Sequence, residues 1–222
     1  MESSTQQERP EFSAASVAAI GAALVGELLS SAIEFGALVT DPIYWGRGVA
    51  RGDQHPVMVI PGLFAGDGYL AAMRDWLRRI GYTPVRSRLN FNPGWSEELV
   101  ASLGDFAAEA FIESGQRVTI VGHSMGGVIA RSIGVRRSDA VRHVITLGAP
   151  LGAARRPLPS TVRITAIYSR GDLIVEYPQA LASDPGAVNI EVHGGHAGLA
   201  VNPEVYRHLA GVLQHRASSA RN

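Results

Sequence analysis

The stretch Val118-Thr-Ile-Val-Gly-His-Ser-Met-Gly-Gly127 decides the fold of this 222-residue chain. Four strand-forming residues lead into the pentapeptide 122–126, and a helix-forming segment, 128–135, follows. A G-x-S-x-G pattern between a strand and a helix is typical of a nucleophile elbow, a sharp turn that presents a serine hydroxyl above the edge of a sheet. Glycines two residues before and after the serine leave room for such a turn. We therefore expect Ser124 to be a nucleophile.

On both sides of this turn, apolar runs typical of strands alternate with helical patterns. The predicted strands are 55–60, 82–89, 118–121, 141–147, 162–168 and 188–192, and the predicted helices are 69–80, 96–113, 126–135 and 202–215. The last helix has Asn202 at its N-cap, Pro203 after it and Glu204 in its first turn, a typical helix start. The alternation predicts an α/β fold, with a mostly parallel sheet covered by helices on both faces. Ligands bind such sheets at the carboxyl ends of the strands.

A serine nucleophile needs a base, and the base needs an orienting acid. In a fold with this elbow, the chain order is serine, then acid, then histidine. Asp172 follows the predicted strand 162–168, and both His193 and His196 follow strand 188–192, so all three lie at the expected edge. His196 stands further from the strand end than His193 and can extend toward Ser124, which favours His196 as the base. His193 is then interpreted as a turn residue. Asp139 and Asp184 are weaker candidates because we expect them in surface turns.

An oxyanion hole, formed by two backbone N–H groups, must complete such a site. One donor is expected from Met125, the residue after the nucleophile. The other is expected from the glycine-containing loop 61–66 after the first strand, where Leu63 is our choice. The remaining histidines, His123 included, are interpreted as structural or surface residues.

The composition excludes several other chemistries. The 20 basic residues are all arginine, they balance 20 acidic residues, and the chain has no cysteine. Disulfides, thiolate nucleophiles, lysine Schiff bases and a lysine-containing phosphate loop are therefore impossible. Zero net charge with dispersed arginines argues against nucleic-acid binding. The predicted chemistry needs no metal and no cofactor.

Five segments together resemble the α/β-hydrolase superfamily, and within it the small lidless bacterial triacylglycerol lipases of Bacillus type. The similar segments are 58–66 (MVIPGLFAG), 120–127 (IVGHSMGG), 144–150 (VITLGAP), 165–176 (TAIYSRGDLIVE) and 188–199 (VNIEVHGGHAGL). The resemblance covers roughly residues 55–215 and implies Ser124, Asp172 and His196 as a triad. It also implies Leu63 and Met125 as oxyanion donors. One departure is Pro61, where that family usually has histidine.

The predicted function is that of a serine carboxylic-ester hydrolase, an esterase or lipase, acting on apolar small-molecule or lipid esters. Only 13 residues separate Gly148 from Val162, which is too short for a helical cap, so we expect an open serine. Six apolar residues are candidates for an acyl-binding groove: Phe64, Trp95, Leu151, Leu173, Ile174 and Leu199. Two alternatives stay open: an acyltransferase on the same fold and a non-catalytic binding protein.

The first 54 residues are predicted to form a polar tail and a helical extension of a catalytic domain at 55–217. Residues 12–39 have a helical pattern, interpreted either as a helix packed on the domain or as one that binds a membrane surface or a second copy. The lack of basic residues on its polar face favours the first interpretation. The uncharged run 12–26 is too short to span a bilayer, and no positively charged region precedes it as in a signal peptide. These observations predict a cytoplasmic protein, with membrane association through 12–39 as the alternative.

Overall fold

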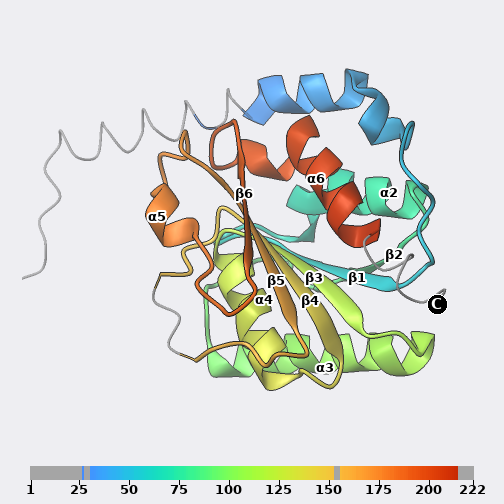
Figure 1. The fold of residues 1–222 in the computed structure, drawn as a ribbon, viewed down its shortest axis with the longest axis vertical. Coiled ribbons are helices and arrows are strands. Elements are labelled where there is room, and N and C mark those ends of the chain that lie inside the picture. The colour runs from blue at the N-terminus through green and yellow to red at the C-terminus, as the bar shows by residue number, and fades with distance from the viewer. Residues whose placement is uncertain (1–26, 28–30, 153–155, 215–222) are drawn as a thin grey trace, which may run out of the picture.

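The computed structural model describes residues 27, 31–152 and 156–214 of the chain, and its centre is a parallel β-sheet (Figure 1). Its strands are β1 (Pro56–Ile60), β2 (Thr83–Arg86), β3 (Val118–His123), β4 (Val141–Leu147), β5 (Arg163–Ser169) and β6 (Val188–Val192). They are ordered β2-β1-β3-β4-β5-β6, and every neighbouring pair is parallel. The predicted α/β class is confirmed.

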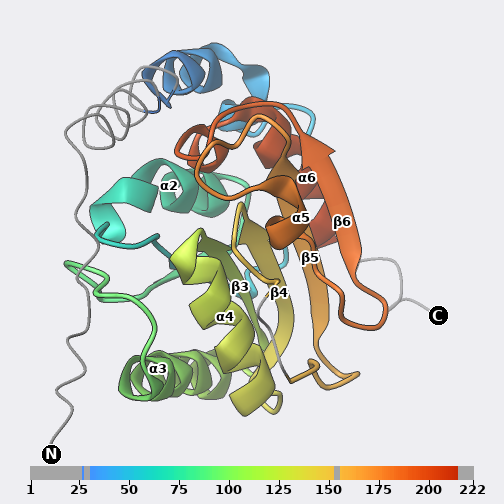
Figure 2. The same ribbon diagram turned by 90° about the vertical axis from the view of Figure 1, so that its left-hand side faces the viewer.

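Helices cover both faces of this sheet, as Figure 2 shows. One face carries α3 (Glu97–Ser114) and α4 (Met125–Arg136), and the other carries α2 (Ala71–Arg79) and α6 (Pro203–Gln214). Single turns connect the larger elements: η1 (Pro42–Trp45), η2 (Asp67–Leu70), α5 (Tyr177–Ala180) and η3 (Gly198–Ala200). The typical start of α6 is confirmed, because Asn202 Oδ1 accepts a 2.8 Å hydrogen bond from the Glu204 amide.

The sheet divides the core into two apolar layers. Alternate residues of β1 serve the two layers: Val57 and Val59 face α2 and α6, whereas Met58 and Ile60 face α3 and α4. All four side chains are fully buried. A central strand buried on both faces has a continuous apolar sequence, as seen in 56–60.

The strand order reverses between β1 and β3, and this reversal positions the site. From β1 the chain crosses to β2 on one side and later returns to β3 on the other. In open sheets of this kind, ligands bind outside the carboxyl ends of the strands at such a reversal, which is where the loops after β1 and β3 begin. Gly62 and Ser124 lie in these two loops, and a Cβ on Gly62 would lie 3.2 Å from Ser124 Cβ.

Strand β2 ends at Arg86, although the sequence pattern predicted a strand up to residue 89. The Asp67 carboxylate accepts hydrogen bonds from Ser87 Oγ (2.6 Å) and from the Arg88 amide (3.1 Å), and Arg88 has a positive φ of 60°. These contacts turn the chain away from the sheet. Asp184 begins a turn as expected, since its carbonyl accepts a 3.0 Å hydrogen bond from the Ala187 amide. Its side chain, however, is only 5% exposed and forms an ion pair with Arg131 at 2.6 Å.

The N-terminal helix is described at Glu27 and at residues 31–40, where it is helical as predicted. Leu38 is fully buried in the core layer that contains α2 and α6. The rest of the predicted helix, 12–26 and 28–30, lies outside the described residues, as does the tail 1–11. Across the described ranges, no helix combines the length and the apolar character that membrane crossing needs.

Candidate active site

Ser124 lies on a tight turn between β3 and α4. Its backbone angles are φ 52° and ψ −126°, a strained combination for a residue with a side chain. Both flanking residues must be glycine because a side chain would collide with the backbone. A Cβ on Gly122 would lie 2.3 Å from the Gly126 carbonyl oxygen, and a Cβ on Gly126 would lie 2.3 Å from the Ile60 carbonyl oxygen. The G-x-S-x-G pattern therefore has a steric origin, and Ser124 precedes the N-terminus of α4, where negative charge is stabilised.

Asp172 and His196 meet at the same edge of the sheet, beyond the ends of β5 and β6. Asp172 Oδ2 lies 2.7 Å from His196 Nδ1, and the two side chains are 1% and 11% exposed. Asp172 Oδ1 accepts hydrogen bonds from the amides of Ile174 (2.9 Å) and Val175 (2.8 Å). The carboxylate is thus held by its own loop, and it selects the imidazole tautomer that carries its proton on Nδ1.

Gly148, after β4, leaves the space in which this pair meets. Its φ is +54°, and a Cβ there would lie 2.9 Å from Asp172 Oδ2 and 3.4 Å from His196 Nδ1. Leu199 would also collide with that Cβ, at 2.8 Å. Only glycine fits here, for both its conformation and its lack of a side chain.

The third member of the predicted triad is not hydrogen-bonded to the other two. Among the described residues, no hydrogen bond joins the Ser124 hydroxyl to the His196 imidazole. The residue next to Ser124 does contact His196. The ring centroid of His123 lies 4.9 Å from that of His196, and His123 Nε2 forms a 2.8 Å hydrogen bond with the His196 carbonyl. The structure therefore places the Ser124 turn next to His196 without a hydrogen bond between the serine hydroxyl and the imidazole.

His123 itself is a structural neighbour of the site. It is buried, and this burial, with a smaller effect of His196, lowers its pKa to about 4. It is therefore neutral at pH 7 and can donate through Nε2 to the His196 carbonyl without adding charge.

Side chains from several segments also hold the loop that carries His196. Four of them donate to its carbonyl groups: Asn202 Nδ2 to His193 (2.6 Å), Ser169 Oγ to Gly194 (2.7 Å), His123 Nε2 to His196 (2.8 Å) and the Tyr69 hydroxyl to Ala197 (2.8 Å). These contacts could not be predicted from the sequence, because the donors lie far apart along the chain and follow no motif. The rejected histidine, His193, has a fully exposed side chain.

The loop after β1 leaves Leu63 as the candidate second oxyanion donor. The next two amides are engaged, since Phe64 N–H donates to Asn92 (2.8 Å) and Ala65 N–H to Gly62 (3.2 Å). Met125 begins α4, where a backbone N–H has no partner within the helix. Met125 directly follows Ser124, and Leu63 directly follows Gly62, on which a Cβ would lie 3.2 Å from Ser124 Cβ.

The six acyl-groove candidates separate into two groups. Phe64, Trp95, Leu173 and Ile174 are 67%, 47%, 78% and 50% exposed, and Phe64 stacks on the exposed Phe91. Leu151 is buried, and Leu199 lies wholly within the core. Trp95 and Leu151 line a cavity of about 750 Å³ along α4, together with Val128 and Ser132. Four of the six candidates are therefore exposed to solvent, whereas Leu199 is a core residue and does not line a groove.

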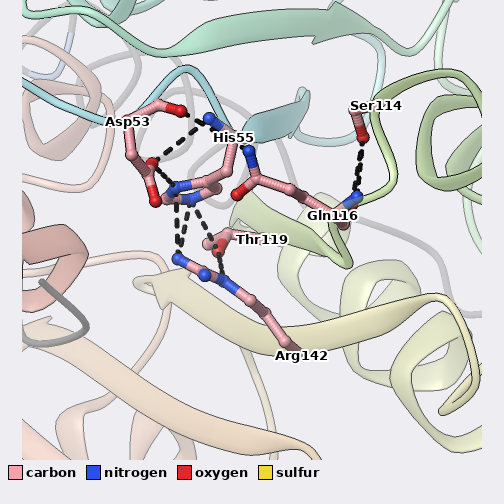
Figure 3. Close-up of polar contacts among 6 residues, drawn as sticks. All are labelled: Asp53, His55, Ser114, Gln116, Thr119 and Arg142. Atoms are coloured by element: carbon pink, nitrogen blue, oxygen red, sulfur yellow. Dashed lines mark hydrogen bonds and ion pairs between the residues drawn. The ribbon is translucent and has the colours of Figure 1, made fainter. Parts of the chain in front are cut away.

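A second acid–histidine–hydroxyl cluster lies at the opposite edge of the sheet (Figure 3). Asp53 contacts His55 at 2.7 Å, and His55 in turn contacts Thr119 Oγ1 at 3.3 Å and Arg142 at 2.9 Å. Thr119 and His55 are 0% and 1% exposed, so a substrate cannot reach them. The cluster joins the amino ends of β1, β3 and β4 and has a structural role. In the described part of the chain, no group of acidic and histidine side chains is arranged to hold a metal ion.

Solved structures of known proteins share this fold. A monoacylglycerol lipase from Paleococcus ferrophilus matches 74% of the chain over 96% of its own length, with a TM-score of 0.55 and 12% identity. One of the metagenome-derived lipolytic enzymes LipS and LipT matches 76% over 96%, with a TM-score of 0.58 and 12% identity. The α/β-hydrolase MGS-MChE2, from the metagenome of lagoon sediments of Mar Chica, Morocco, matches 75% over 93%, with a TM-score of 0.56 and 18% identity.

These structural likenesses establish an α/β-hydrolase fold, as the sequence resemblance implied. No curated protein matches the sequence. A family model does: that of the PGAP1-like alpha/beta domain, over residues 107–218, which contain Ser124, Asp172 and His196. The narrower resemblance to Bacillus-type lipases stays a prediction. Since the matched residues make up half of the sequence, the chain belongs to the family of PGAP1-like alpha/beta domains.

Proposed function

We propose that this protein is a serine hydrolase that cleaves carboxylic esters through an acyl-enzyme on Ser124. The observation that carries the proposal is the 2.7 Å contact between Asp172 and His196 at the sheet edge where the strained Ser124 elbow lies. A binding protein needs neither the strained serine nor a buried acid–histidine pair beside it. Hydrolysis uses both.

The mechanism assigns one role to each group. His196 Nε2 accepts the proton of Ser124 Oγ as this oxygen attacks the ester carbonyl, and Asp172 orients the imidazole and stabilises its cation. The N–H groups of Leu63 and Met125 stabilise the oxyanion of the tetrahedral intermediate. His196 then protonates the departing alcohol. Water, activated by the same histidine, attacks the acyl-enzyme and releases the acid and Ser124. The Ser124–His196 hydrogen bond has to form for the first step.

Apolar esters are the substrate class that the surroundings favour. Exposed apolar side chains come from three loops at the carboxyl edge of the sheet, after β1 (Leu63, Phe64), β2 (Phe91, Trp95) and β5 (Leu173, Ile174). Within the described residues, no helix lies between β4 and β5, where a cap could cover the site. An acyl chain can therefore reach these side chains from solvent and gain from burying apolar surface.

The test is the hydrolysis of p-nitrophenyl esters with acyl chains of 2 to about 12 carbons. We expect kcat/KM to rise as the first methylenes are added to the acyl chain. Each buried methylene contributes about 0.8 kcal/mol, which strengthens binding by up to about fourfold. Added alcohols, with the products separated, distinguish hydrolysis from acyl transfer. Absence of turnover across the whole series would contradict the proposal.

A further inference from the structure

Two carboxylates of the N-terminal helix reach the loop that carries the proposed base. Glu27 and Glu34 are seven residues apart, two helical turns, so they lie on the same face of the helix. Figures 1 and 2 both show this helix beside the segment between β6 and α6. Glu27 is only 7% exposed, which is rare for a carboxylate without a specific partner.

The partners of these carboxylates are the two amides that flank His196. The Ala197 N–H donates to Glu27 Oε2 at 2.8 Å, and the Gly195 N–H donates to Glu34 Oε1 at 3.4 Å. The Tyr69 hydroxyl holds the carbonyl of the same Ala197. Burial, together with the charges of Glu27 and Glu34, raises the pKa of Tyr69, so this hydroxyl keeps the proton that it donates.

The glycines of the segment 193–198 (HGGHAG) provide the space for this contact. A Cβ on Gly195 would lie 3.1 Å from both oxygens of Glu27. A Cβ on Gly198 would lie 2.4 Å from Glu34 Oε1, and one on Gly194 would lie 2.7 Å from the same oxygen. Three glycines around one histidine are thus explained by the approach of the N-terminal helix.

We propose that Glu27 and Glu34 are positioning residues that hold the backbone on both sides of His196 and so aim its imidazole at Ser124. The loop 193–197 belongs to no strand or helix, so its amides depend on side chains for hydrogen bonds. A hydrogen bond to a carboxylate is stronger than one to a neutral acceptor. The inference rests on the proposed function for its effect on rate, and it gives two side chains of the N-terminal helix, Glu27 and Glu34, a role in positioning His196.

The test compares Glu27→Ala with Glu27→Gln, since the glutamine carbonyl can still accept the Ala197 N–H. We expect kcat for a short p-nitrophenyl ester to fall about 10-fold to 100-fold in Glu27→Ala, with KM changed less than threefold, because misplacing a base costs rate more than binding. Glu27→Gln should recover most of kcat. Thr40→Ala, which shortens an exposed side chain on the same helix, should leave both kcat and KM unchanged.

Amide hydrogen exchange in the full-length protein makes the inference testable without activity. We expect Glu27→Ala to speed exchange at Ala197 at least 10-fold, while amides of β3 and β4 keep their protection. Unchanged exchange at Ala197, or equal kcat in Glu27→Ala and wild type, would overturn the positioning role. If wild type hydrolyses no ester while exchange responds as expected, the proposed function fails and the contact with the loop stands.

Discussion

Replacing Ser124 with alanine should abolish ester hydrolysis while the protein stays folded. We expect kcat to fall at least ~10⁴-fold, because removing the nucleophile leaves only the contributions of the oxyanion donors and of substrate binding. Alanine keeps the Cβ, so the strained backbone at φ 52° changes little and the melting temperature should stay within a few degrees of wild type. The measurement is the initial rate with p-nitrophenyl butyrate, alongside thermal unfolding.

Ser114→Ala is the matched control for this variant. Ser114 ends α3 and hydrogen-bonds only within its own turn, to the Ala110 and Gln116 carbonyls and the Gln116 amide, so its loss should leave turnover unchanged. Undiminished turnover in Ser124→Ala would remove Ser124 from the mechanism.

His196→Ala should lower kcat/KM at least ~10³-fold, whereas His193→Ala should change it less than about threefold. The two histidines are three residues apart, yet only His196 contacts Asp172, at 2.7 Å. The His193 side chain is fully exposed, and its nearest acid is Glu204 at 3.5 Å. Rates measured for both variants under the same conditions give the ranking, and the reverse order would move the base to His193.

Local patterns in the sequence predicted the sheet and the turns at its carboxyl edge. The apolar runs of β1, β3 and β4 have the composition of strands buried on both faces. Between a strand and a helix, the G-x-S-x-G pattern is typical of one kind of turn, the one that Ser124 occupies. The contact between Asp172 and His196 could be predicted because chain order and strand ends confine both residues to one edge of the sheet. These signals depend on neighbouring residues, and for this reason they can be interpreted without a structure.

Contacts between distant segments could not be predicted in this way. Glu27 and Glu34 show only helical spacing in the sequence, and nothing there indicates that they meet residues 195–197. The burial of the Asp184 side chain could not be predicted because Arg131, its ion-pair partner, is 53 residues away. The position of Leu199 in a loop favours a groove residue, whereas in the structure its side chain packs beside Gly148 and lies in the core.

The most direct test of the central claim is the site at which a fluorophosphonate probe attaches. A serine activated by a histidine attacks the phosphorus and displaces fluoride, leaving a stable phosphonyl ester. We predict a single adduct per chain, mapped by peptide mass spectrometry to the peptide containing Ser124, and none in Ser124→Ala. No adduct on the wild-type protein, or an adduct on another residue that persists in Ser124→Ala, would contradict the account.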